Sequence, residues 1–251
     1  MAITLFGQST RPLVENETTL LDGDSAGPTL TLTPPASMLS GDLVWVSVLS
    51  RNSPSPTNSA TGGQTWTAST VDTSLANHRA RNFWSVFNGT WTADPAFGGG
   101  VSGSPMQATM LVFRSNLTTP GFSLDAIEAQ AAVSGLVSPF EVTTPSLSPS
   151  AGALTIARFT TTNDVTWSVV SSTFGGWSNV PWRNQAGSDC AMAVAYNLLS
   201  TTGTQTITEE MTVFTQTSAV SSIVSFVETG TPSGPTPTPA FGRYGVRSPS
   251  R

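Results

Sequence analysis

The chain has 251 residues, of which 38% are hydrophobic and 10% are charged, a balance that supports a buried core and excludes simple disorder. Its net charge is −5, all ten basic residues are Arg, and no segment carries a run of them, so the sequence lacks the basic footprint of a nucleic-acid-binding protein. Thr, Ser, Val, Phe and Trp are abundant and the strong helix formers are scarce. This composition predicts an all-β protein built from many short strands.

The N-terminal residues do not show the pattern expected of an export signal. Residues 1–7 lack a basic region and an apolar stretch, and no apolar run in the chain reaches the roughly 18 residues that a membrane-spanning helix needs. We expect residues 1–27 to form an N-terminal arm and lead-in, and the protein to be made in the host cytoplasm without a signal peptide. The single Cys190 cannot form an internal disulfide and is expected to be a small buried side chain.

The lead-in contains a motif that imitates a serine nucleophile. Ser25 lies in the sequence Gly-Asp-Ser-Ala-Gly, but a nucleophilic serine needs a histidine base, and the only histidine, His78, comes in the wrong order for the known serine-hydrolase patterns. Asp22 and Asp24 have calcium-loop spacing, yet the twelfth position of that loop is Thr33 instead of Glu. We expect no catalytic residue, metal or cofactor here, and we expect His78 to be a solvated loop residue.

The body of the chain contains an internal repeat, with two similar copies offset by 111 residues. Residues 33–43 and 144–154 share Thr, Pro, Ser, Gly and Leu in register, and Trp66 recurs as Trp177 after a Gly-containing turn. Apolar stretches in both copies alternate with period two. In residues 44–48, for example, this alternation predicts a strand packed on one face.

We predict that both copies belong to one sandwich domain spanning residues 28–228. The half-repeats would cover about 28–125 and 139–228, and the Ala-rich residues 126–138 would form a packed, briefly helical crossover. About eight to ten strands at this spacing predict a jelly-roll-like β-sandwich with a twofold internal pseudo-repeat and extended terminal arms. Two small domains, one for each copy, are the alternative.

The final segment differs from the body in composition. Residues 229–251 hold five Pro, four Gly and three Arg but no acidic residue, and Pro-Thr-Pro-Thr-Pro at 235–239 should be extended and unable to join a central strand. We expect a C-terminal docking arm, for which a frayed terminus is the alternative. Its candidate anchors are Phe241, Arg243, Tyr244, Arg247 and Arg251.

Tryptophan offers a possible carbohydrate site, because an indole face can stack on a sugar ring. Trp66 and Trp177 occupy equivalent positions in the two copies, which favours a packing role for both. Trp182, with Arg183 and Asn184 in an expected polar loop, is the better candidate for a glycan contact. An ordinary loop anchor is the alternative for Trp182.

The acidic residues form no recognisable catalytic pair. Glycoside hydrolysis needs two facing carboxylates, and the sequence gives no means of pairing the candidates. Glu209 and Glu210 are adjacent, so in a strand they would point to opposite faces. We therefore expect no enzymatic activity from the candidates, which are Asp72, Asp94, Asp125, Glu128, Asp164, Asp189, Glu209 and Glu210.

The pattern of turns and strands resembles a β-sandwich domain of virion structural proteins from tailed bacteriophages. The likeness rests on residues 34–44, the Ser/Pro/Asn/Gly loop that follows, residues 63–67 and the strand 82–87, and it extends over roughly 28–228. It is a structural pattern without a catalytic signature. The resemblance implies a non-enzymatic structural part of a virion, with head decoration or cement slightly favoured over a tail-surface position.

The resemblance also implies the partners: other virion proteins, such as major capsid or tail subunits, and copies of this chain itself. The second copy departs from the pattern, because Ala153 stands where the first copy has Asp42. The alternative function is a carbohydrate-binding, host-recognition module of a tail or cell-surface protein. Neither hypothesis involves nucleic acid or a membrane span.

Overall fold

The computed structural model describes residues 4–9, 29–51, 55–70, 72–75, 78–99, 106–115, 117, 119–161, 165–173, 175–184, 191–198, 200, 202–212 and 218–230. Every regular element in these ranges is a strand, which confirms the all-β prediction, and none of them forms a helix able to cross a membrane. The strands are β1 (Thr4–Ser9), β2 (Leu30–Thr31), β3 (Leu43–Arg51), β4 (Thr57–Ala60), β5 (Thr67–Ala68), β6 (Asp72–Leu75), β7 (His78–Val86), β8 (Ala96–Gly98), β9 (Met106–Arg114), β10 (Phe122–Ser134), β11 (Phe140–Thr143), β12 (Leu154–Thr161), β13 (Thr166–Ser172), β14 (Trp177–Asn184), β15 (Ala191–Asn197), β16 (Ile207–Thr212) and β17 (Ser218–Glu228).

These strands form four antiparallel sheets, two in each half of the chain. In the first half, sheet A has the order β1-β9-β3-β7-β5, with β6 also paired to β7, and sheet B has the order β2-β8-β4. In the second half, sheet C has the order β10-β17-β12-β15-β14 and sheet D the order β11-β16-β13. Each order in one half reproduces the order in the other, strand by strand.

The internal duplication predicted from the sequence is therefore confirmed. The equivalent strands β3 and β12 start at Leu43 and Leu154, and β8 and β16 start at Ala96 and Ile207, both pairs 111 residues apart. The shared glycine of the repeat adopts a positive φ in both copies, +95° at Gly41 and +78° at Gly152, because the turn before β3 and β12 requires it.

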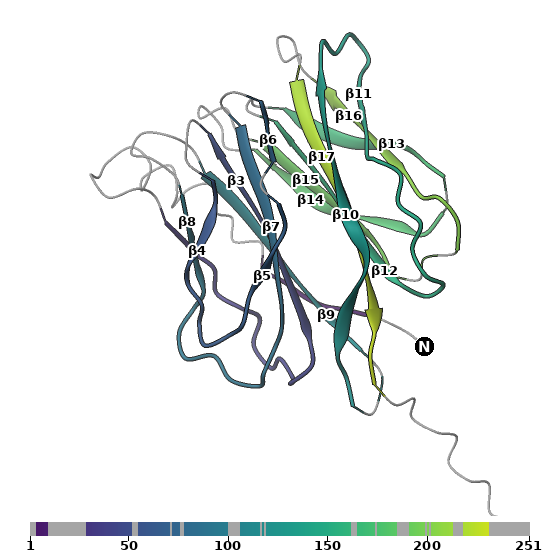
Figure 1. The fold of residues 1–251 in the computed structure, drawn as a ribbon. Helices are drawn as coiled ribbons and strands as arrows, with labels where there is room; N and C mark the ends of the chain where they lie inside the picture. The colour runs from purple at the N-terminus through teal and green to yellow at the C-terminus, as the bar shows by residue number, and fades with distance from the viewer. Residues whose placement is uncertain are drawn as a thin grey trace, which may run out of the picture.

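The four sheets are stacked in the order B, A, C, D (Figure 1). One apolar cluster lies between B and A, a second between A and C, and a third between C and D. Sheets A and C are consequently covered on both faces, so β3, β9 and β12 are buried along almost their whole length. The one-sided packing predicted for residues 44–48 is wrong: Val44 and Val46 enter the B–A cluster, and Trp45 enters the A–C cluster.

The β-sandwich class is confirmed, but the described residues contain seventeen strands instead of the predicted eight to ten or so, and each half builds its own pair of sheets. Very short strands such as β2 and β5 are only two residues long, and so carry no detectable alternation. The halves nonetheless share one core between A and C. The jelly-roll connectivity stays a prediction.

Two further expectations are corrected. Residues 126–138 are not a helical crossover, because most of them lie in β10, which pairs with β17 along its length. Within the predicted N-terminal arm, Thr4–Ser9 is β1 and pairs with β9 of the same chain, so it belongs to sheet A and does not extend toward a neighbour. At the other end, β17 finishes at Glu228, next to the predicted start of the C-terminal arm.

The junction of the two halves also contains buried hydrogen bonds. His78 Nε2 and Thr160 Oγ1 lie 2.9 Å apart, and Arg158 Nη1 donates to Asn82 Oδ1 at 3.0 Å. Asn82 Nδ2 in turn donates to Ser222 Oγ at 3.2 Å. These bonds fix the register between sheets A and C, which an apolar contact alone leaves undefined.

The loss of Asp42 in the second copy is compensated from another strand. In the first half, Asp42 accepts hydrogen bonds from the Leu39 backbone N–H and from Arg114 on β9, both at 2.8 Å to Oδ2. In the second half, Asp125 of β10 accepts from the backbone N–H and the hydroxyl of Ser150, which is the counterpart of Leu39. Both turns thus keep a carboxylate although Ala153 cannot supply one.

Candidate functional site

The structure places the predicted glycan residues on a strand. Trp182, Arg183 and Asn184 belong to β14, the last strand in the order of sheet C, so the expected polar loop is wrong at this position. Their side chains lie outside the described part of the structure. Trp66 and Trp177 are both partly buried against apolar clusters, as their equivalent positions suggested.

The predicted arm anchors lie outside the described residues: Phe241, Arg243, Tyr244, Arg247 and Arg251. The same holds for Ser25, for the Asp22 and Asp24 pair and for Cys190. Among the residues that the structure describes, no three His, Cys, Asp or Glu side chains gather as metal ligands.

The expectation for His78 is wrong. Its side chain is fully buried at the start of β7, where it faces Thr160 of the second half. Desolvation, followed by the charges of Arg158 and Arg79, lowers the pKa of His78 to about 3, so the imidazole is neutral at physiological pH. His78 is therefore part of the junction between the halves and has no contact with solvent.

Glu209 and Glu210 point to opposite faces of β16, as their adjacency predicted. Glu209 shares the inward face with Ile207 and Met211 and is 1% exposed, whereas Glu210 is partly exposed. Both carboxyl oxygens of Glu209 lack a hydrogen-bond partner among the described residues, and burial raises the pKa of the side chain to about 8. The carboxyl is enclosed beside the apolar cluster between C and D, which includes Ile207 and Met211.

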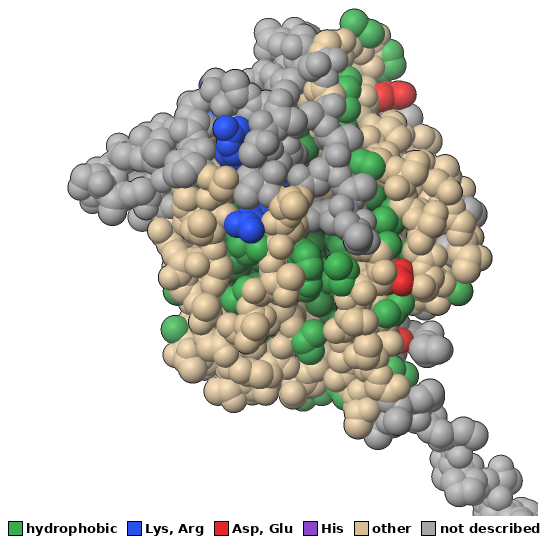
Figure 2. All heavy atoms as spheres, viewed as in Figure 1, with side chains coloured by type: hydrophobic (Ala, Val, Ile, Leu, Met, Phe, Trp, Pro, Cys, Tyr) green, Lys and Arg blue, Asp and Glu red, His purple; other side chains and the backbone are tan. Residues whose placement is uncertain are grey.

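Among the residues that the structure describes, the best candidate for a functional site is a groove where the two halves meet. It has a volume of about 410 Å³ and is lined from the first half by β3, β5 and β7 and from the second by β10 and β17. Hydrophobic side chains gather there on the face seen in Figure 2. The lining residues are Leu43, Thr65, Thr67, Trp84, Ser85, Val86, Phe122, Ser123, Leu124 and Phe226.

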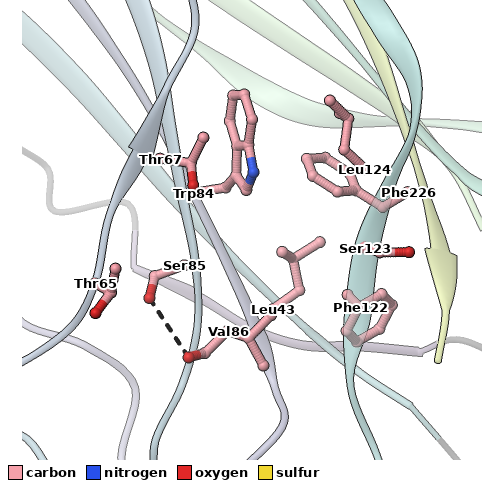
Figure 3. Close-up of a pocket in the computed structure, with 10 residues that line it drawn as sticks. All are labelled: Leu43, Thr65, Thr67, Trp84, Ser85, Val86, Phe122, Ser123, Leu124 and Phe226. Atoms are coloured by element: carbon pink, nitrogen blue, oxygen red, sulfur yellow. Dashed lines mark hydrogen bonds between the residues drawn. The ribbon is translucent and has the colours of Figure 1, made fainter. Parts of the chain in front are cut away.

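An aromatic pair forms the contact across the groove. Trp84 of β7 meets Phe226 of β17 edge to face, with ring centroids 5.7 Å apart. Figure 3 shows Trp84 on one side and Leu124 with Phe226 on the other, with Leu43 below and between them and Val86 farther down on the β7 side. Because each wall comes from a different half, the groove exists only through the shared A–C core.

The rim of the groove is polar but uncharged. Thr65 and Thr67 are exposed at its first-half edge, and the Ser85 hydroxyl donates to the Val86 carbonyl at 3.4 Å. None of the described residues that line the groove is ionisable. Its chemistry therefore suits an uncharged, partly apolar ligand that can accept hydrogen bonds from hydroxyl groups.

Sequence reasoning did not find this groove. The alternation that includes Trp84 and Val86 predicts a strand there. It does not show which strands lie opposite, or that the surface between them is open. The comparisons with known proteins add no assignment: no protein-family model matches the chain, and neither the curated proteins nor the solved structures contain a match.

Proposed function

We propose that this chain is a non-enzymatic structural subunit of a bacteriophage virion that docks on neighbouring subunits through its double sandwich and the arm 229–251. Its partners are other virion proteins, namely capsid or tail subunits, and copies of itself. A head decoration or cement role is slightly favoured over a tail-surface position. The proposal combines the sequence resemblance with one structural observation, the shared core of the two halves.

The continuous B–A–C–D stack carries the proposal. Domains in one chain move relative to each other unless their interface is large and hydrophobic. Here the interface is a buried cluster that includes Trp45 and Phe113 from the first half and Ile156 and Phe226 from the second. A stack of this kind behaves as one stiff block, which suits a part that holds other subunits in a fixed arrangement.

The buried polar groups support the same proposal. His78, Asn82 and Arg158 bond across the A–C junction, and Asp42 and Asp125 hold the two equivalent turns. These side chains, which in many enzymes would do chemistry, are used here to fix the fold.

A carbohydrate-binding module is the second candidate, and the groove gives it one favourable observation. An indole ring at Trp84 lies beside the exposed hydroxyls of Thr65 and Thr67, a combination that sugar sites use. However, the described lining offers no carboxylate or amide to bond sugar hydroxyls, so the structural role is preferred. Saturable glycan binding that is lost in Trp84→Ala or Trp182→Ala would favour this second candidate.

The test is the copy number and position of the protein in purified particles, measured by quantitative mass spectrometry and cryo-electron microscopy. Many copies on the head would support decoration, and fewer copies at the tail would support a tail-surface role. Absence from particles contradicts the proposal.

The arm is tested by a chain that ends at Gly230. We expect it to fold normally but to be incorporated poorly into particles. The triple variant R243Q/R247Q/R251Q separates the contribution of charge from that of length. Normal incorporation of the shortened chain contradicts the docking role of the arm.

A further inference from the structure

The groove leaves apolar side chains uncovered. Only four large hydrophobic residues in the described part of the chain are strongly exposed, and two of them, Val86 at 40% and Leu124 at 42%, line this groove from opposite halves of the chain. Apolar side chains that are exposed singly are common on protein surfaces, whereas a cluster of them often marks a binding surface. The groove therefore suits an uncharged, partly apolar occupant.

We propose that the segment Pro-Thr-Pro-Thr-Pro, residues 235–239, occupies this groove in the same molecule. A sequence with proline at every second position favours the polyproline II conformation, whose backbone carbonyls have no internal hydrogen bonds. Segments of this kind bind to grooves lined by aromatic residues. Trp84, which is partly exposed and packs on the buried Phe226, supplies the aromatic surface, and Thr65 and Thr67 supply hydroxyl donors at the rim.

The end of the described chain lies close to the groove. The Thr229 backbone N–H donates to the Gly121 carbonyl at 2.8 Å, and Gly230 packs against the Thr119 carbonyl. Gly121 precedes Phe122, which lines the groove, and β17 carries Phe226 into it. Only four residues separate Gly230 from Pro235, a span of at most about 17 Å for extended chain.

The intervening sequence favours a reversal of the chain toward the groove. Residues 231–234 read Thr-Pro-Ser-Gly, with proline second and glycine fourth, the arrangement that type I turns prefer. A turn there directs residues 235–239 back along β17 instead of away from the body. Such a turn brings the Cα atoms of residues 231 and 234 within about 7 Å of each other, so the segment 235–239 would begin close to Gly230.

The charges also match. No residue from Thr229 to Gly242 is charged, and the described lining of the groove is uncharged as well. The first charge of the tail is Arg243, beyond the segment that would be bound. The groove would therefore anchor the base of the arm and leave Arg243, Arg247 and Arg251 available to a neighbouring subunit.

The same molecule is favoured over a neighbour because the connection is short. A short linker gives an effective concentration of about 1 mM, which exceeds the concentration of a second copy in dilute solution. A segment with a Kd of about 0.1 mM would then fill about nine-tenths of the grooves. The inference concerns the isolated molecule, so its failure would leave the proposed role in particles untouched.

The experiment measures the accessibility of the groove with a thiol reagent. Leu124→Cys is introduced into the full chain and into a chain that ends at Gly230, and the rate of modification at position 124 is followed by peptide mass spectrometry, which separates it from Cys190. We expect the shortened chain to react about tenfold faster, because the occupant is gone. Val137→Cys, 76% exposed beyond the far end of β10, is the matched control and should react equally in both chains.

A second variant keeps the length of the chain. Replacing Pro235, Pro237 and Pro239 with Ser in the Leu124→Cys chain should raise the rate as the truncation does, while circular dichroism shows the fold unchanged. Equal rates in the intact, shortened and substituted chains overturn the proposal. A double variant, Leu124→Cys with Thr236→Cys, tests which molecule supplies the occupant. On oxidation we expect a disulfide within one monomer. Disulfide-linked dimers would overturn the proposal, because the occupant would then belong to a second copy.

Discussion

The buried carboxyl of Glu209 predicts an unusual loss of stability at neutral pH. In the unfolded chain this group ionises near 4.5, whereas burial in the apolar cluster raises its pKa in the folded protein to about 8. Between these values unfolding releases a proton, so an increase in pH favours the unfolded chain. The destabilising effect is absent below pH 4.5 and complete above pH 8.

The magnitude follows from the pKa difference. Each pH unit between 4.5 and 8 lowers the free energy of unfolding by about 1.4 kcal/mol, which gives a penalty of about 3 kcal/mol at pH 7 and less than about 1 kcal/mol at pH 5. Glu209→Gln has nearly the same shape and cannot ionise. Its unsatisfied amide has a cost that does not vary with pH.

The assay is urea-induced unfolding of the wild type and of Glu209→Gln at pH 5, 6 and 7. We expect the stability of the variant relative to the wild type to increase by about 2.5 kcal/mol between pH 5 and 7. Taking this difference cancels the effect of His78, which titrates identically in both proteins. Glu210→Gln, on the other face of β16, is the control and should show no such trend. A pH-independent difference for Glu209→Gln would refute the burial of an unpartnered carboxyl.

Two further predictions concern the junction and the repeated turn. Because the pKa of His78 is lowered to about 3, the free energy of unfolding should fall as pH decreases from 6.5 toward 3, by about 3 kcal/mol at pH 4. In His78→Gln the melting temperature should depend less on pH over this range. An imidazole that titrates near 6.5 by NMR would contradict this. Gly152→Ala should cost about 1 kcal/mol, because only its positive φ opposes a side chain. Gly41→Ala, at the equivalent position, should cost at least about 3 kcal/mol, because the added Cβ would overlap the Pro120 carbonyl; equal costs in urea denaturation would show that this contact is absent.

The features of the fold that local chemistry dictates could be predicted from the sequence. The turn glycines Gly41 and Gly152 and the paired Trp66 and Trp177 revealed the duplication, because the same turn needs the same residue in both copies. The position of His78 could not be predicted in this way. Its polar sequence neighbours indicate a loop, and only the approach of sheet C buries it.

β10 shows how tertiary pairing overrides local preference. Residues 126–134 are rich in Ala, which favours helix, yet they form the edge strand of sheet C and pair with β17, so tertiary pairing and not local propensity decides their conformation. Register shifts near Ala126 mark where the strand bends to remain paired. The groove escaped prediction for a related reason: Trp84 and Phe226 are far apart in the sequence, and only the stacking of the halves brings them together.

Sheets A and C pack face to face, and this arrangement predicts how one half would behave alone. The two sheets are equivalent in the duplication, and each presents an apolar face, with Leu43 and Leu154 as matching members. Two copies of one patch that bury each other are the hallmark of a symmetric homodimer. A half on its own would expose that face, whereas the covalent link between the halves makes the pairing independent of concentration. A half expressed alone should therefore still dimerise.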